Sequence, residues 1–173
     1  MRYRKARKED LEQLLQIIED AKQYMRENGF EQWNETYPKA EHVLEDIEKE
    51  ECYVWEKNEN ILGMATICLD GEPIYDQIEG AWNTEHPYGT IHRFAVAKDA
   101  RGEGVSAKLL YLGEKICQEE GCTGIRVDTH RQNKTMQRFL EKHGYTTCGI
   151  VYYEGKKGDS ARITYDKIFK PIG

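Results

Sequence analysis

The feature that most constrains this chain is a glycine loop between a predicted strand and a predicted helix. Thr90 to Val96 is expected to form the strand, 97–101 a turn, and the residues from Val105 onward a helix. The first backbone N–H groups of a helix have no partner inside it, and the helix dipole makes that end positive. Gly102 and Gly104 let the backbone approach a bound group closely. The loop therefore predicts a phosphate-binding site.

The helix after the loop is predicted from its apolar stripe, which consists of Val105, Leu109, Leu112 and Ile116.

Two common classes of phosphate-binding loop fit this segment poorly. A P-loop nucleotidase requires the pattern GxxxxGK[ST], which the sequence lacks. The spacing Gly102-x-Gly104-x-x-Ala107, with Asp128 about 20 residues further on, matches the loose dinucleotide-binding fingerprint. In a dinucleotide fold, however, the first glycine directly follows the strand, whereas Ala97 to Arg101 intervene here. The chain after Asp128 has room for only one helix and a hairpin, so we disfavour this class.

The rest of the chain predicts one mixed α/β domain over residues 1–173. A short first strand is followed by two helices, the second after Pro38. Residues 52–56 and 61–69 predict a β-hairpin, and residues 70–88 a loop, or a loop carrying short strands. The two N-terminal helices are marked by apolar residues at helical spacing, namely Leu11, Leu14, Leu15, Ile18 and Met25, and then Val43, Leu44 and Ile47.

The C-terminal third predicts a further strand, a helix and a closing hairpin. Ile125 to Thr129 is expected to be the strand, and Gly144 to cap the helix that follows. That helix is marked by Met136, Phe139, Leu140 and His143 at spacings i, i+3, i+4 and i+7. Residues 145–153 and 161–169 are expected to pair as an antiparallel hairpin around the polar turn GKKGD.

The composition indicates the cellular compartment of the protein and excludes some classes of partner. The net charge of −6 argues against a nucleic-acid partner, because such proteins cluster Lys and Arg. No segment approaches the roughly 18 to 20 apolar residues of a membrane span, and the N-terminus lacks a signal-peptide core, so we expect a cytoplasmic protein. The five cysteines show no CxxC pairing, which predicts idle thiols and no metal site. A homodimer is left open.

The stretch IHRFAVAKDARGEGVSAKLLYLGEKICQEEGCTGIRVDTHRQNKTMQRFLEKHGY resembles the core of the GNAT superfamily of N-acetyltransferases. In that family the loop reads Arg or Gln, two residues, Gly, one residue, then Gly or Ala. Arg101, Gly104 and Ser106 occupy those places here. Ser106 departs from the pattern, but serine is small enough to keep the backbone close to the pyrophosphate. The resemblance is specific over residues 90–145 and fits the element order of the whole chain.

The resemblance implies a mixed central sheet of about seven strands, flanked by about four helices and splayed between its fourth and fifth strands. The fourth strand is then Thr90 to Val96. Acetyl-CoA would be the cosubstrate, with its pantetheine arm on the strand and its pyrophosphate on the loop. Asn133 matches an Asn that contacts the cofactor in many members, although a helix N-cap explains it equally well. The implied cofactor-binding residues are Phe94, Ala95, Val96, Arg101, Gly102, Glu103, Gly104, Val105, Ser106, Asn133 and Phe139.

Acetyl transfer also requires a donor to the thioester carbonyl, a base for the ammonium and a proton for the leaving thiolate. The resemblance implies a backbone N–H near Phe94 or Ala95 as the carbonyl donor. His92 is the first candidate for the base, because it stands where many relatives carry a glutamate and its ordinary pKa suits the role. A structural imidazole is the alternative, and Glu79 and Asp76 are weaker candidates.

The proton donor is harder to assign from the sequence. Phe139 occupies the place of the family's usual acidic tyrosine, and a phenyl ring has no proton to give. Tyr152, His143 or water would have to replace it, although His143 beside Gly144 is also explained as a helix C-cap. A non-catalytic acyl-CoA-binding module is therefore the alternative to an active enzyme. The remaining histidines, His42, His86 and His130, show no ligand spacing and are expected at the surface.

The acceptor pocket is expected to come from two segments rich in aromatic and acidic residues. These are Glu27 to Tyr37, with Phe30 and Trp33, and the 70–88 loop with Trp82. Such a mixture suits a cationic amine. The alternative is that the aromatic residues belong to the core and the carboxylates are solvated. The acceptor class stays open among small amines, polyamines, amino acids and protein N-termini.

Overall fold

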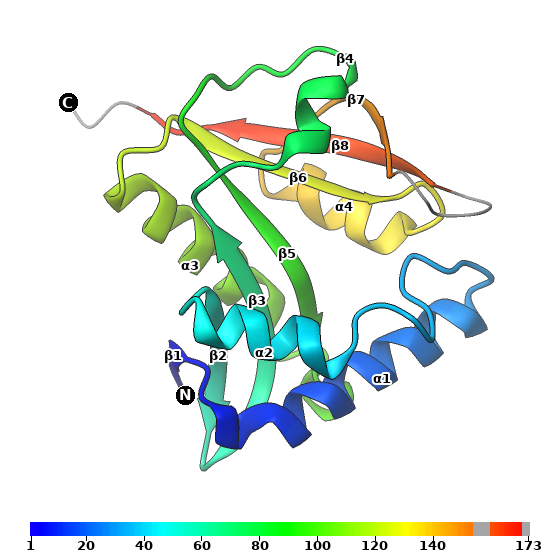
Figure 1. The fold of residues 1–173 in the computed structure, drawn as a ribbon, viewed down its shortest axis with the longest axis vertical. Coiled ribbons are helices and arrows are strands. Elements are labelled where there is room, and N and C mark those ends of the chain that lie inside the picture. The colour runs from blue at the N-terminus through cyan, green and yellow to red at the C-terminus, as the bar shows by residue number, and fades with distance from the viewer. Residues whose placement is uncertain (154–159, 171–173) are drawn as a thin grey trace. The chain divides into compact units, whose positions relative to one another are not determined.

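The computed structural model describes residues 1–153 and 160–170. They form a mixed α/β fold with a single open sheet of strand order β1-β2-β3-β5-β6-β8-β7-β4 (Figure 1). The strands are β1 Arg2–Lys5, β2 Cys52–Lys57, β3 Asn60–Cys68, β4 Glu79–Gly80, β5 Tyr88–Val96, β6 Gly124–His130, β7 Thr146–Tyr152 and β8 Ala161–Ile168. The α-helices are α1 Leu11–Glu27, α2 Ala40–Glu48, α3 Val105–Glu119 and α4 Lys134–Lys142, and the short 3-10 helices are η1 Lys8–Asp10, η2 Pro73–Gln77 and η3 Lys98–Ala100.

The predicted fold class is confirmed, with one strand more than expected. The additional strand is β4, two residues long, which lies in the predicted loop and pairs with β7. The polar turn predicted at GKKGD lies outside the described residues. In the part of the chain that is described, none of the helices combines the length and the apolar character that crossing a bilayer requires.

The chain divides into two compact units, each described here by itself. Unit 1 comprises Met1–Cys68 and Ile91–Gly113, and unit 2 comprises Leu69–Thr90 and Glu114–Gly173, of which the last three residues and 154–159 are not described. Two elements run from one unit into the other. These are β5, which crosses the boundary after Thr90, and α3, which crosses it after Gly113.

In unit 1 the predicted hairpin is confirmed as β2 and β3, joined through Asn58 and Glu59. Both turn residues have positive φ, 50° and 68°, as the turns that match the strand twist require. β1 pairs antiparallel with β2. The core forms where the predicted apolar stripes of α1 and α2 meet the hairpin, and its fully buried members include Leu14, Ile18, Val43, Val54 and Met64.

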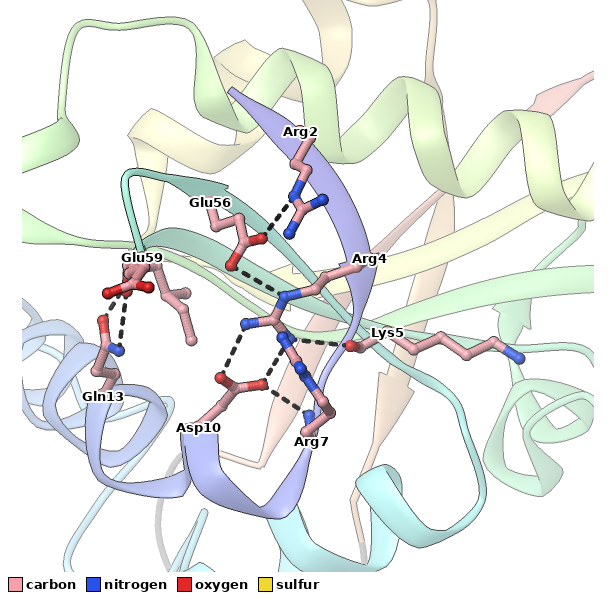
Figure 2. Close-up of polar contacts among 9 residues, drawn as sticks. Arg2, Arg4, Lys5, Arg7, Asp10, Gln13, Glu56 and Glu59 are labelled. Atoms are coloured by element: carbon pink, nitrogen blue, oxygen red, sulfur yellow. Dashed lines mark hydrogen bonds and ion pairs between the residues drawn. The ribbon is translucent and has the colours of Figure 1, made fainter.

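An ion-pair network fixes the start of α1 to the sheet of unit 1 (Figure 2). Arg4 on β1 donates to both carboxylate oxygens of Asp10, at 2.7 and 2.9 Å, and to Glu56 on β2 at 2.9 Å. Glu56 also accepts a bond from Arg2, and the Arg7 N–H donates to Asp10. Asp10 and Glu56 are nearly buried, so each charge is paired where water is scarce.

In unit 2 the strands β6, β8 and β7 pair antiparallel, which confirms the closing hairpin. The beginning of β5 pairs parallel with β6, and the register covers Tyr88 to Thr90 opposite Gly124 to Arg126. The other half of β5 belongs to unit 1. The parallel pairing with β6 thus covers three residues of the nine-residue strand β5, all of them in unit 2.

The segment before β5 is held on the sheet of unit 2 by buried polar groups. Asp166 on β8 accepts bonds from the backbone and side chains of Asn83 and Thr84, at 2.7 to 3.1 Å. Arg126 on β6 donates to the Thr84 hydroxyl and to its carbonyl, each at 2.7 Å. The guanidinium of Arg126 also lies 3.9 Å from the ring centroid of Tyr88 and 4.6 Å from that of Trp82. These contacts order a segment that has little regular structure.

Candidate active site

The glycine loop lies in unit 1, directly before α3, as the sequence predicts. The start of α3 packs closely on β3 at Gly63. A Cβ there would lie 2.8 Å from Val105 and 2.9 Å from Leu109, so only glycine allows this approach. Val105 and Leu109 are buried, which confirms the predicted stripe. The packing fixes the direction in which the helix, and its positive end, points.

The loop has the properties of an anion cradle. Gly102 and Gly104 have φ of +88° and +77°, a backbone conformation that side chains other than glycine rarely adopt. A Cβ at either residue would meet no atom within 4 Å, and Arg101 to Gly104 are exposed. The first intrahelical bond runs from the Lys108 N–H to the Gly104 carbonyl, at 3.2 Å. The N–H groups of Val105, Ser106 and Ala107 precede this bond and therefore lack helical partners, whereas the Glu103 N–H donates to the Ala100 carbonyl. The open space beside Gly102 and Gly104 fits a pyrophosphate.

The strand residues that the resemblance implicates are also in unit 1. His92, Phe94 and Val96 are partly buried, and Ala95 is buried. Arg93, between His92 and Phe94, has φ +47°. A left-handed residue inside a strand interrupts the regular alternation of peptide N–H groups, so the backbone at Phe94 departs from ordinary strand geometry.

In unit 2, Asn133 and Phe139 lie on α4. The Asn133 carboxamide oxygen accepts a bond from the Met136 N–H at 3.2 Å, so Asn133 is the N-cap of this helix. Phe139 is partly buried, with its ring centroid 4.5 Å from that of His143. His143 is the C-cap residue, and its Nδ1 lies 2.7 Å from the Phe139 carbonyl oxygen. The structural explanation of His143 is thereby confirmed.

Two of the alternative acid–base candidates in unit 2 bind each other. Glu79 on β4 and Tyr152 on β7 are both exposed, and the Tyr152 hydroxyl donates to the Glu79 carboxylate. The negative charge of Glu79 raises the pKa of Tyr152, which makes this tyrosine a poorer proton donor. Asp76 lies exposed on η2.

Some expectations from the sequence are wrong at the level of single side chains. His130 was expected at the surface, but it is 1% exposed and its Nδ1 accepts a bond from the Gln132 N–H. Phe30 and Trp33 are buried in the core of unit 1, as the alternative reading had it. Trp82 already packs against Arg126, an internal cation. These aromatic residues therefore pack against groups of their own units.

Arg93 is the residue that the sequence reasoning missed. Its guanidinium forms an ion pair with Asp46 on α2. An arginine inside a strand with few charged residues was a signal that it needed a partner. The partner itself, 47 residues away, and the left-handed backbone could not be found from one sequence.

The five cysteines are all free, as expected. Burial raises the pKa of Cys52 and of Cys68 to about 12, so these thiols are unreactive near neutral pH. In the described part of the chain, no group of three or more His, Cys, Asp or Glu residues could hold a metal ion.

Known proteins of one family match this sequence and this fold. The sequence profile of the acetyltransferase (GNAT) family matches residues 11–145. The crystal structure of a GNAT-family acetyltransferase from Streptococcus agalactiae is 31% identical, with a TM-score of 0.83, over 98% of this chain and 96% of its own. S-(2-succino)cysteine N-acetyltransferase of Bacillus subtilis is 28% identical over 153 residues, which are 86% of each chain.

A plant relative matches over a shorter region. GCN5-related N-acetyltransferase 6 of Arabidopsis thaliana, a chloroplast protein, is 26% identical over 97 residues, and the match spans 34% of its length.

The open mixed sheet and these matches identify the protein as an acyltransferase. The chain belongs to the GNAT acetyltransferase family. It is an acetyl-CoA-dependent N-acetyltransferase, an enzyme that acts on an amine.

Proposed function

We propose that this enzyme binds the pyrophosphate of acetyl-CoA on the backbone amides of residues 101–106 and transfers the acetyl group to the amine of a small molecule. The observation that carries the proposal is the cradle itself. Gly102 and Gly104 are left-handed, their missing side chains would meet open space, and the positive end of α3 begins beside them.

The pantetheine arm is proposed to lie along Phe94, Ala95 and Val96, and the N–H of Phe94 or Ala95 to donate to the thioester carbonyl. A preorganised donor stabilises the charge that develops on this oxygen, an effect typically of about 3 kcal/mol. Asn133 and Phe139 are also proposed to bind the cofactor. The cap bond of Asn133 does not exclude this role, because its amide nitrogen keeps two donors.

In the reaction, the neutral amine nitrogen attacks the thioester carbonyl carbon, and the carbon–sulfur bond then breaks to release the CoA thiolate. An alkyl ammonium must first lose a proton. His92 is proposed as the base, directly or through water. Its place next to Arg93 on β5 and its partial burial support this role. Glu79 is a weaker candidate, since it is exposed and already accepts a bond from Tyr152.

For the acceptor, we propose an amine carried by an amino acid or a similar small molecule. The Bacillus subtilis relative, which is named as an N-acetyltransferase of S-(2-succino)cysteine, supports this class because it matches 86% of this chain.

We also propose that residues 1–173 act as one catalytic domain in the cytoplasm. A homodimer is the assembly to test first, and nucleic acid is proposed not to be a partner. The match of a solved acetyltransferase to 98% of the chain supports the single domain.

The test has a binding arm and a transfer arm. Acetyl-CoA should raise the melting temperature, because it binds the folded state. Gly104→Val should remove most of that rise, while Gly29→Ala, at another left-handed glycine of unit 1, should keep it. Released CoA should then be measured with a panel of S-substituted cysteines, other amino acids, polyamines and a peptide with a free N-terminus. An undiminished rise in folded Gly104→Val would overturn the cradle, and transfer to the peptide alone would overturn the small-molecule acceptor.

A further inference from the structure

Arg93 adopts a backbone conformation that its side chain makes uncommon. It has φ +47° in the middle of β5. Residues other than glycine persist in this region only where their surroundings fix them, and they concentrate at functional sites. Two of the other left-handed non-glycine residues, Asn58 and Glu59, lie in a tight turn, where positive φ is expected. No turn explains Arg93, because β5 continues on both sides of it.

The side chain of Arg93 is held by groups from two other segments of unit 1. Its Nε and Nη2 donate to the two carboxylate oxygens of Asp46 on α2, the second at 2.7 Å. Its Nη1 donates to the Tyr37 hydroxyl at 2.5 Å. Asp46 is 5% exposed and also accepts a bond from Thr66 on β3, at 2.8 Å. A fork-shaped guanidinium bound at three points cannot rotate freely, so the backbone that carries it is fixed as well.

The residues on either side of Arg93 are those proposed to act in the reaction. His92 is the proposed base, and Phe94 carries a proposed N–H donor to the thioester carbonyl. A left-handed residue between them redirects the peptide that follows it, in the way that a β-bulge redirects a strand. Donor geometry matters strongly here, since displacements of about 1 Å can cost roughly 100-fold in rate.

We propose that the ion pair between Arg93 and Asp46 is a positioning device, which holds the left-handed backbone of β5 at Arg93 and so orients His92 and the Phe94 N–H for acetyl transfer. Tyr37 extends the device to the segment between α1 and α2. The role of the ion pair in acetyl transfer rests on the proposed function, whereas its effect on the backbone of residue 93 does not. Arg93 is a positioning residue here and not a catalytic one, since it acts through its neighbours.

A buried ion pair could instead contribute only to stability, and unit 1 contains a matched example of that kind. Arg4 donates to both oxygens of Asp10 (Figure 2), as Arg93 does to Asp46. Arg4 lies on β1 without a left-handed backbone, away from the proposed site residues in the sequence. Asp10→Asn is therefore the control for Asp46→Asn, because each change removes the charge from a buried, bidentate partner of arginine.

The first experiment compares these two variants by melting temperature, turnover and acetyl-CoA affinity. Both should melt at lower temperature. Asp46→Asn should lower turnover about tenfold or more while acetyl-CoA affinity changes less than about threefold, and Asp10→Asn should keep turnover within about twofold. Tyr37→Phe, which deletes a single hydroxyl, should fold readily and lower turnover less than Asp46→Asn does. Unchanged turnover in both Asp46→Asn and Tyr37→Phe would overturn the proposal.

A second pair of variants separates the backbone angle from the ion pair. Arg93→Gly and Arg93→Ala both lose the guanidinium, but only glycine adopts positive φ without strain. Arg93→Gly should therefore retain several times more turnover than Arg93→Ala. Equal losses would mean that the left-handed angle is unimportant, which would overturn the proposal.

A measurement without substrate makes the outcome independent of activity. The HN–Hα coupling and the carbon shifts of residue 93 report φ by NMR. They should change in Asp46→Asn and stay unchanged in Asp10→Asn. If φ stays left-handed in Asp46→Asn, the ion pair does not hold the backbone of residue 93 and the inference is wrong. If wild type transfers acetyl to no amine of the panel, the proposed function fails, while this measurement still decides whether the ion pair holds the left-handed backbone of residue 93.

Discussion

The hydroxyl of Tyr152 on β7 donates to the carboxylate of Glu79 on β4, with 3.3 Å between the oxygens. The carboxylate raises the pKa of Tyr152, so the phenol holds its proton more tightly than a free tyrosine does. A group of this kind is unsuited to protonate a thiolate whose own pKa is near that of cysteine, about 8.5.

We therefore predict that Tyr152→Phe leaves turnover within about twofold of wild type, since the proton comes from elsewhere. Steady-state kinetics on the best amine of the panel will test this. A loss of about 100-fold, the size expected when a general acid is removed, would instead assign the proton donation to Tyr152.

His92→Ala is predicted to lower turnover by about 100-fold or more, with little change in acetyl-CoA affinity, because a general base acts on the amine and not on the cofactor. The dependence of turnover on pH should flatten in the range where the imidazole titrates. His86→Ala, at an exposed histidine of unit 2, serves as the control and should match wild type. Near-normal turnover of His92→Ala from pH 6 to 9 would show that His92 is structural.

Phe139 is predicted to be compatible with catalysis, because a CoA thiolate is a good leaving group and can take its proton from water or from the product. Wild type should therefore transfer acetyl groups, and Phe139→Tyr should be tolerated or faster. Phe139→Ala should weaken cofactor binding and stability together, since it removes a partly buried ring. If Phe139→Tyr transfers acetyl groups and wild type transfers none, wild type is better described as a non-catalytic acyl-CoA-binding module.

The stability of unit 2 is predicted to depend on the ionised form of Asp166. Burial alone would raise the pKa of Asp166, but hydrogen bonds from Asn83 and Thr84 outweigh burial and lower it. A carboxyl whose pKa is lowered by folding stabilises the protein above its unfolded pKa, near 3.9, and loses this contribution as the pH falls through the lower, folded value.

Asp166→Asn should accordingly reduce the free energy of unfolding by about 1 to 3 kcal/mol at pH 7, because the amide replaces an acceptor with a donor that faces other donors. Denaturant unfolding at several pH values will measure the difference, which should narrow below about pH 4 as wild-type Asp166 takes up a proton. Asp70→Asn, at an exposed position, should differ from wild type by less than about 0.5 kcal/mol throughout. A difference that is constant with pH would contradict the proposed charge dependence.

Much of the fold could be predicted from the sequence, because its signals are local. The apolar stripe of α3, the Asn58–Glu59 turn and the cap at Gly144 each depend on residues within a few positions of one another. The loop from Arg101 to Ser106 was also readable, since glycines beside a helix start have few other uses. The resemblance over residues 90–145 then supplied the family, and with it the cosubstrate.

The tertiary structure decided which polar and aromatic side chains are free to act. The sequence suggested a surface position for His130 and a place in the acceptor pocket for Trp82. In the structure His130 is buried and Trp82 packs on Arg126. The contact of Arg93 with Asp46 joins residues 47 positions apart, and its left-handed backbone leaves no trace in residue type. A sequence pattern reports local periodicity, whereas burial, partner choice and backbone strain are settled only when distant segments pack together.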